Sequence, residues 1–94
     1  MLNGYNVLFE FMEILGKKWV VPLLLILLFY DKTTFTRIKK QLGVTSRALS
    51  KKLKLLEALG LVEKIADSPR SIIYALSEKG KEVSRMLLGL RQIF

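Results

Sequence analysis

The sequence contains no cysteine and no histidine among its 94 residues. Without cysteine there can be no disulfide bond, thiolate metal site or cysteine nucleophile. Without histidine the chain lacks the most common metal ligand and the usual general base. The eight acidic residues are scattered singly, and no glycine-rich phosphate loop is present. We therefore expect a protein that is not an enzyme and that binds no metal and no cofactor.

Acidic residues are few. The chain has 8 Asp and Glu and 16 Lys and Arg, which gives a net charge of +8. The excess of positive charge is concentrated in residues 17–60, which contain ten basic residues and only two acidic residues, Asp31 and Glu57. A chain of this length forms one domain. The charge favours a polyanionic partner, either nucleic acid or an anionic membrane surface, although an ordinary solvated surface would also account for it.

Long apolar segments are also lacking, since the longest run is the twelve residues 19–30. A membrane-spanning helix needs about 20 such residues, and a run of 10–14 is more typical of a buried helix. Pro22 fits this interpretation, because proline is tolerated in the first turn of a helix. No signal peptide is recognisable. We expect a cytoplasmic protein without a membrane partner.

Hydrophobic periodicity and helix-end signals predict a mainly α fold with a small β-hairpin, an α+β domain spanning residues 1–94. Gly16, Gly43 and Gly60 are expected to end helices, while Thr45 and Ser77 are expected to begin them. A short β-prone segment lies at 33–35. The predicted helices cover 5–15, 19–30, 36–42, 46–59 and a final segment from 78, and the predicted strands are 61–66 and 71–76, joined by a turn at 67–70.

Two helices joined by a short glycine-containing turn, followed by a hairpin, form the pattern of a winged helix-turn-helix. On the helix at 46–59, Leu49, Leu53 and Leu56 share one face at about 100° per residue. The opposite face is basic and hydroxylic, which suits contacts with base edges in a major groove. A plain solvated face is the alternative. The predicted base-reading residues are Ser46, Arg47, Ser50, Lys51 and Lys54.

Other basic residues around this helix are expected to bind phosphates and so to orient the protein on DNA without reading sequence. They are Arg37, Lys39, Lys40 and Lys52. Arg70 lies in the turn at 67–70, where it is placed to enter a minor groove. It is equally interpretable as a turn residue that happens to be basic.

The first and last predicted helices carry more apolar surface than one small domain needs, and such surface usually marks a partner. This pattern predicts a homodimer through residues 1–16 and 77–94, with 17–76 as the DNA-binding core. Completion of each monomer's own core is the alternative. The predicted interface residues are Leu8, Phe9, Phe11, Met12, Met86, Leu87, Leu90, Ile93 and Phe94.

Several motifs resemble those of HxlR-type, MarR-like winged helix-turn-helix transcriptional regulators. Residues 16–19 read GKKW, similar to the family's Gly-Gly-Lys-Trp, and residues 34–38 resemble its Arg-Phe-x-Glu-Leu. Residues 49–62 resemble its Leu-x3-Leu-x2-Leu-Glu-x2-Gly-Leu-Val, and residues 74–80 its Tyr-x-Leu-Thr-x2-Gly. The resemblance implies a homodimer built from the terminal helices, with one recognition helix per subunit in a major groove.

The chain departs from that family at Thr34, where arginine is usual, and at Arg37, where glutamate is common. Family members that sense oxidants use a cysteine near the N-terminus, and its absence here excludes thiol sensing. Whether a small-molecule effector exists is left open: Trp19, Tyr5 and Phe11 would suit either an apolar dimer cleft or the core.

We thus predict a homodimeric regulator that binds double-stranded DNA, with residues 46–59 in the major groove and the wing at 67–70 at the minor groove. The alternative is a winged helix that serves as a protein-interaction or assembly module without specific DNA readout. A weaker alternative is a basic protein that docks on anionic membrane.

Overall fold

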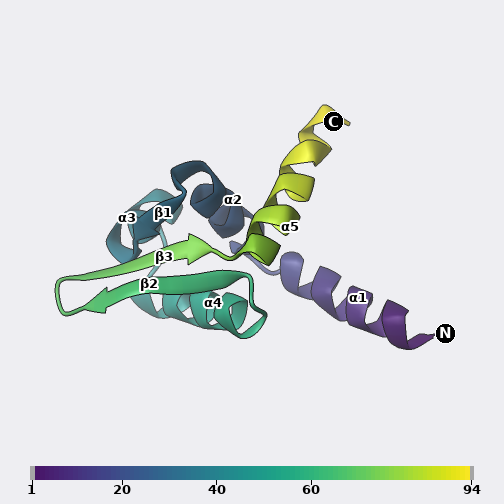
Figure 1. Cartoon of the computed structure of the whole chain (residues 1–94), viewed down its shortest axis with the longest axis horizontal. Helices are drawn as coiled ribbons and strands as arrows, with labels where there is room; N and C mark the ends of the chain where they lie inside the picture. The colour runs from purple at the N-terminus through teal and green to yellow at the C-terminus, as the bar shows by residue number, and fades with distance from the viewer. Residues whose placement is uncertain (1, 94) are drawn as a thin grey trace.

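The computed structural model describes residues 2–93, with side chains from residue 4 onward (Figure 1). The helices and strands follow the predicted order closely. They are α1 (Leu2–Leu15), α2 (Val20–Tyr30), β1 (Lys32–Thr34), α3 (Phe35–Leu42), α4 (Ser46–Ala58), β2 (Val62–Ser68), β3 (Ser71–Leu76), α5 (Glu78–Gly89) and a short 3-10 helix, η1 (Leu90–Gln92).

The predicted hairpin is part of a larger sheet. Strand β1 pairs with β3, so the sheet has three antiparallel strands in the order β1-β3-β2. Thr33 lies opposite Tyr74 in this pairing, and Phe35, expected in the β-prone segment, instead begins α3. A bulge at Ile65 shifts the register of β2 against β3. Strand β1 therefore connects the segment that leads into α3 with the hairpin.

Helix α2 forms the centre of the core, which confirms the prediction of a buried helix at this apolar run. Its residues Val20, Leu23, Leu24 and Leu27 are fully buried. No helix within residues 2–93 is long and apolar enough to cross a membrane. The rest of the core comes from the helix-turn-helix and the sheet: Ile38, Leu42, Leu49, Leu53, Leu56, Leu61, Val62, Tyr74 and Leu76.

The helix-end signals around α4 are confirmed in detail. The Oγ1 atom of Thr45 accepts a hydrogen bond from the backbone N–H of Ala48 at 3.1 Å, which caps the start of α4. At its end Gly60 adopts a φ of 73°, and the N–H of Leu61 bonds to the carbonyl of Leu56 at 2.9 Å. This pairing is a Schellman motif, which needs a left-handed residue and therefore favours glycine.

The molecule measures 48 × 29 × 24 Å, and its long dimension runs from the turn of the β2–β3 hairpin to the far end of α1 (Figure 1). Helix α1 and helix α5 with η1 project from the same end of the domain, while the β2–β3 hairpin extends toward the opposite end. The core therefore separates the hairpin turn from the two projecting helices.

Candidate nucleic-acid interface

The face of α4 opposite the core is basic, as predicted. Leu49, Leu53 and Leu56 are buried, whereas Arg47, Lys51 and Lys54 are exposed. Ser46 is exposed and Ser50 half-buried at the edge of the same face. Glu57, the one carboxylate of α4, is half-buried in the last turn. The first three turns of α4 thus present guanidinium, ammonium and hydroxyl donors with no competing acidic acceptor.

Helix α3 presents a second basic surface beside α4. Its start is capped by Thr34, whose Oγ1 accepts a hydrogen bond from the N–H of Arg37 at 3.1 Å. The side chains of Arg37 and Lys40 are exposed, and that of Lys39 is half-buried. Lys52, on the flank of α4, is also half-buried. Lysine stems commonly lie along apolar surface while the ammonium group stays in water.

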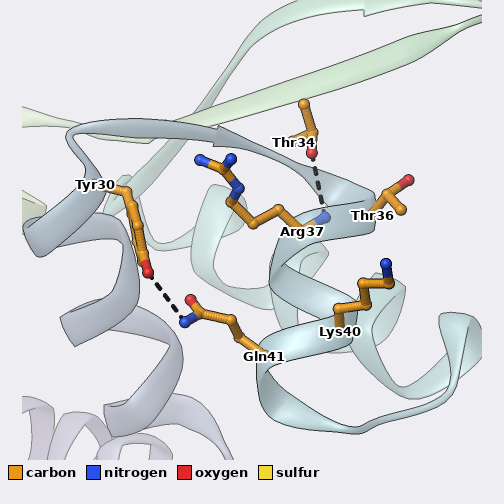
Figure 2. A pocket seen from close by; sticks show the side chains of 6 residues that line it. All are labelled: Tyr30, Thr34, Thr36, Arg37, Lys40 and Gln41. Carbon is orange, nitrogen blue, oxygen red and sulfur yellow. Dashed lines mark hydrogen bonds between the residues drawn. The ribbon is translucent and has the colours of Figure 1, made fainter.

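An open hollow of about 470 Å³ lies along the outer side of α3. Figure 2 shows that its walls come from the end of α2, the end of β1 and the exposed side of α3. Two cations, three hydroxyl groups and one amide line it, and none of the lining residues is a carboxylate. The lining residues are Tyr30, Thr34, Thr36, Arg37, Lys40 and Gln41.

Side chains join two walls of this hollow, the end of α2 and the exposed side of α3. The amide Nε2 of Gln41 donates a hydrogen bond of 3.0 Å to the Tyr30 hydroxyl. The guanidinium carbon of Arg37 lies 5.6 Å from the centre of the Tyr30 ring, within the range of a cation–π contact. Sequence reasoning selected Arg37 and missed Tyr30 and Gln41, because they lie eleven positions apart and no periodicity connects them.

The wing is longer and its turn tighter than predicted. Strand β2 extends through Asp67 and Ser68, which were expected in the turn, so only Pro69 and Arg70 connect the strands. The Ser68 hydroxyl holds this end: it accepts from the Ser71 N–H at 3.2 Å and donates to the Ser71 carbonyl at 3.1 Å. Arg70 is therefore exposed at the hairpin turn.

Nearer the core, the wing carries a small charged cluster. The ammonium group of Lys64 lies 3.5 Å from the Asp67 carboxylate and 6.0 Å from the centre of the Tyr74 ring. Burial raises the pKa of the Tyr74 phenol above its ordinary value, and Lys64 opposes this shift. Tyr74 therefore stays uncharged near neutral pH, and this cluster adds little net charge to the wing.

Six of the predicted dimer residues line one groove between the projecting helices, and Phe9 and Ile93 are not among its lining residues. The six are Leu8, Phe11, Met12, Met86, Leu87 and Leu90. Met86 and Ile93 are each 73% exposed, and Leu8, Phe9, Met12 and Leu90 are also exposed. An open apolar groove of about 290 Å³ runs between α1 and α5 and continues onto η1. The groove is lined by Leu8, Phe11, Met12, Leu15, Val83, Met86, Leu87 and Leu90. Of the predicted interface, Phe94 lies outside the described residues.

Two of these predicted dimer residues lie partly within the monomer, because Phe11 and Leu87 pack against the core. Trp19 does the same, whereas Tyr5 is exposed and stacks against Phe9 with ring centres 6.4 Å apart. Trp19, Tyr5 and Phe11 therefore do not line one common cleft within a single chain.

Comparison with known proteins adds to this geometry. A family model described as HxlR-like helix-turn-helix matches residues 14–93. The uncharacterized HTH-type transcriptional regulator YvaP of Bacillus subtilis (strain 168) is 36% identical over 78 residues, which cover 80% of this chain and 71% of YvaP. An uncharacterized HTH-type transcriptional regulator of Mycobacterium tuberculosis is 28% identical over 83 residues, which cover 86% of this chain but only 52% of that protein.

A solved structure shows the same fold. It is that of a possible HxlR family transcriptional factor from Thermoplasma volcanium GSS1, which is 34% identical and superposes with a TM-score of 0.72. The match covers 87% of this chain and 75% of the other. The winged helix-turn-helix arrangement described above is therefore shared with a solved protein along most of the chain.

Proposed function

This chain belongs to the HxlR-like helix-turn-helix family of transcriptional regulators, and from that premise we propose that it is a homodimer that binds double-stranded operator DNA sequence-specifically. As a helix-turn-helix regulator it is a DNA-binding protein. It is not an enzyme, as its composition predicted. In the proposed complex α4 enters the major groove, and the turn formed by Pro69 and Arg70 lies at the minor groove.

The exposed face of α4 is the observation that carries the proposal. Arg47, Lys51 and Lys54 follow one another at spacings of four and three residues, so they form a single strip along the helix. Arginine and lysine donate to the O6 and N7 atoms of guanine, and the hydroxyls of Ser46 and Ser50 suit either bases or phosphates. A strip of donors without acidic neighbours matches the acceptor-rich edge of G·C pairs.

The remaining basic residues suit the DNA backbone. Arg37 and Lys40 are exposed on α3, Lys39 and Lys52 extend from half-buried positions, and Arg70 is exposed at the hairpin turn. Contacts of this kind fix the register of the protein on the duplex. The narrow minor groove has a strongly negative potential that favours an arginine such as Arg70.

The projecting helices suit a second copy of the chain. In the proposed dimer, residues 1–16 and 77–94 form the interface around the apolar groove, and residues 17–76 form the DNA-binding core. Two-fold symmetry would present two α4 helices to half-sites spaced by one helical turn or a multiple. A pseudo-palindromic operator is the expected target.

The proposal is tested by selecting bound duplexes from a random pool and then measuring affinity for the best duplex across a salt series. Arg47→Ala and Lys51→Ala are each expected to cost about 1–3 kcal/mol of binding and to relax specificity at one position. Lys32→Ala is the matched control. It removes one exposed positive charge from β1, where Lys32 shares a hollow with Asp31, Glu63 and Glu78 and belongs to none of the surfaces assigned to DNA or to the dimer.

The control separates a specific contact from a loss of net charge. If Lys32→Ala weakens binding as much as Arg47→Ala and Lys51→Ala do, the effect comes from overall charge and the α4 assignment is wrong. If no duplex is enriched, or if affinity does not fall with salt, sequence-specific DNA binding by this chain is refuted. For a DNA-binding protein, log K falls linearly with the logarithm of the salt concentration, and each neutralised phosphate contributes about −0.9 to the slope.

A further inference from the structure

We infer that Tyr30 is a positioning residue, whose ring holds the Arg37 guanidinium at the hollow beside α3 so that Arg37 can meet a DNA phosphate there. The inference rests on the proposed function, because it concerns how one of the phosphate-binding residues is prepared for DNA. It assigns a role to the last residue of α2, which lies outside the helix-turn-helix motif.

The backbone brings Tyr30 to this place. Tyr30 ends α2, and the chain turns sharply at Asp31, which has a φ of 65°. Strand β1 then leads directly into α3, so the end of α2 and the exposed side of α3 become opposite walls of one hollow (Figure 2). Neither wall alone would define the position of a long, exposed arginine side chain.

Two contacts fix the Tyr30 ring and the guanidinium relative to each other. Gln41 donates its 3.0 Å hydrogen bond to the Tyr30 hydroxyl, which anchors the ring to α3. The guanidinium of Arg37 then lies against that ring at 5.6 Å. Figure 2 shows the Arg37 side chain extending from α3 toward Tyr30, whereas Thr36 and Lys40 project from other parts of the helix.

The hollow suits a phosphate. It is open to solvent and has a volume of about 470 Å³, so a phosphate of a bound duplex can reach it. All six lining residues can donate hydrogen bonds, and no carboxylate among them competes for the guanidinium. An arginine stacked on an aromatic ring keeps its donors free at the edge of its plane, so it can bind a phosphate while it remains in place.

The test compares variants on one selected duplex, by affinity and by the slope of log K against log salt. Arg37→Gln removes the charge and is expected to reduce the slope by about 0.9 per bound subunit. Tyr30→Leu keeps every charge but removes the ring. It is expected to weaken binding about twofold to fivefold and to reduce the slope in the same direction.

Two further variants separate positioning from folding. Tyr30→Phe keeps the ring but loses the hydrogen bond from Gln41, and it is expected to restore most of the slope, because the cation–π contact needs only the ring. Phe29→Leu makes the same truncation at the neighbouring residue, which is 65% exposed and takes part in none of the cation–π contacts found within residues 4–93. Thermal unfolding of each variant shows whether its stability has changed. If Tyr30 had a purely structural role, Tyr30→Leu would lower the stability without changing the salt slope.

The double variant Tyr30→Leu with Arg37→Gln completes a double-mutant cycle with the two single variants. If Tyr30 acts through Arg37, the double variant binds like Arg37→Gln alone. The inference is overturned if Tyr30→Leu leaves both affinity and slope unchanged, or if its loss of affinity adds fully to that of Arg37→Gln. Failure of the proposed function would look different, because then the unsubstituted protein itself would bind no duplex with steep salt dependence.

Discussion

Gly80→Ala tests how tightly α5 is docked on the rest of the domain. Gly80 is buried in the first turn of α5, next to the connection between α4 and β2. A methyl group added there would overlap the carbonyl oxygen of Leu61 and lie 2.9 Å from its carbonyl carbon. That carbonyl accepts the 3.0 Å hydrogen bond from the N–H of Ser77, which caps α5. The obstruction is backbone, so it cannot move aside by rotating a side chain.

Two effects of opposite sign decide the outcome. Replacing glycine by alanine inside a helix normally stabilises a protein by about 0.5–1 kcal/mol. Forcing an extra carbon into a packed site normally costs about 1–3 kcal/mol, and a rigid backbone neighbour favours the upper part of that range. We therefore expect Gly80→Ala to lower the free energy of unfolding by about 1–2 kcal/mol. For a domain of this size such a loss lowers the Tm by roughly 5 to 15 °C.

Thermal unfolding at one fixed protein concentration measures this effect, since the stability of a self-associating protein depends on concentration. Gly89→Ala is the matched control. It lies in the same helix, and an added Cβ would meet nothing within 4 Å. It is expected to be neutral or to stabilise by up to about 0.5–1 kcal/mol. If Gly80→Ala raises the Tm as Gly89→Ala does, the close approach of α5 to Leu61 is wrong.

Three further predictions concern the cap of α4, the buried tyrosine and the proposed dimer. Thr45→Ala is expected to lower the free energy of unfolding by about 1 kcal/mol while Thr45→Ser retains it, and equal melting curves of the two variants would refute a capping role. The raised pKa of Tyr74 means that the unfolded chain loses this proton first, so the free energy of unfolding is expected to fall as pH rises above about 10. Denaturant titrations from pH 8 to 11 measure this fall, which Tyr74→Phe is expected to reduce. The pKa of Lys64 is raised first by Tyr74 and then by Asp67, so the variant also loses the larger cause of that shift, and only a small part of the fall is expected to remain. Met86→Glu is expected to weaken self-association about tenfold or more, because it places a charge in the apolar groove. If sedimentation equilibrium shows the same mass for Met86→Glu and for the unsubstituted protein, the proposed interface is wrong.

The local features of the fold follow directly from the sequence. The Thr45 cap, the Gly60 stop and the alternation of buried leucines with exposed cations on α4 depend on residues within a few positions of one another. Their hydrogen bonds and periodicity are fixed by helix geometry, whatever the rest of the chain does. For the same reason the basic face of α4 was predictable from residue spacing alone.

Features that join distant segments were not predictable in this way. Pairing of β1 with β3 connects residues about forty positions apart, and it turns the expected hairpin into a three-stranded sheet. The wing turn shortened to Pro69 and Arg70 because the Ser68 hydroxyl bonds across the strand ends, a contact that depends on the register of the sheet.

Composition and spacing by themselves determined that this chain is a small basic helix-turn-helix protein without the residues for catalysis. Only the tertiary structure decided which residues meet: Tyr30 with Arg37 and Gln41 around one hollow, and Gly80 against the Leu61 carbonyl. The physical reason is that a helix end or an amphipathic face is stabilised by its own neighbours, whereas these contacts exist only after the packing of α2 and the sheet has brought separate segments together.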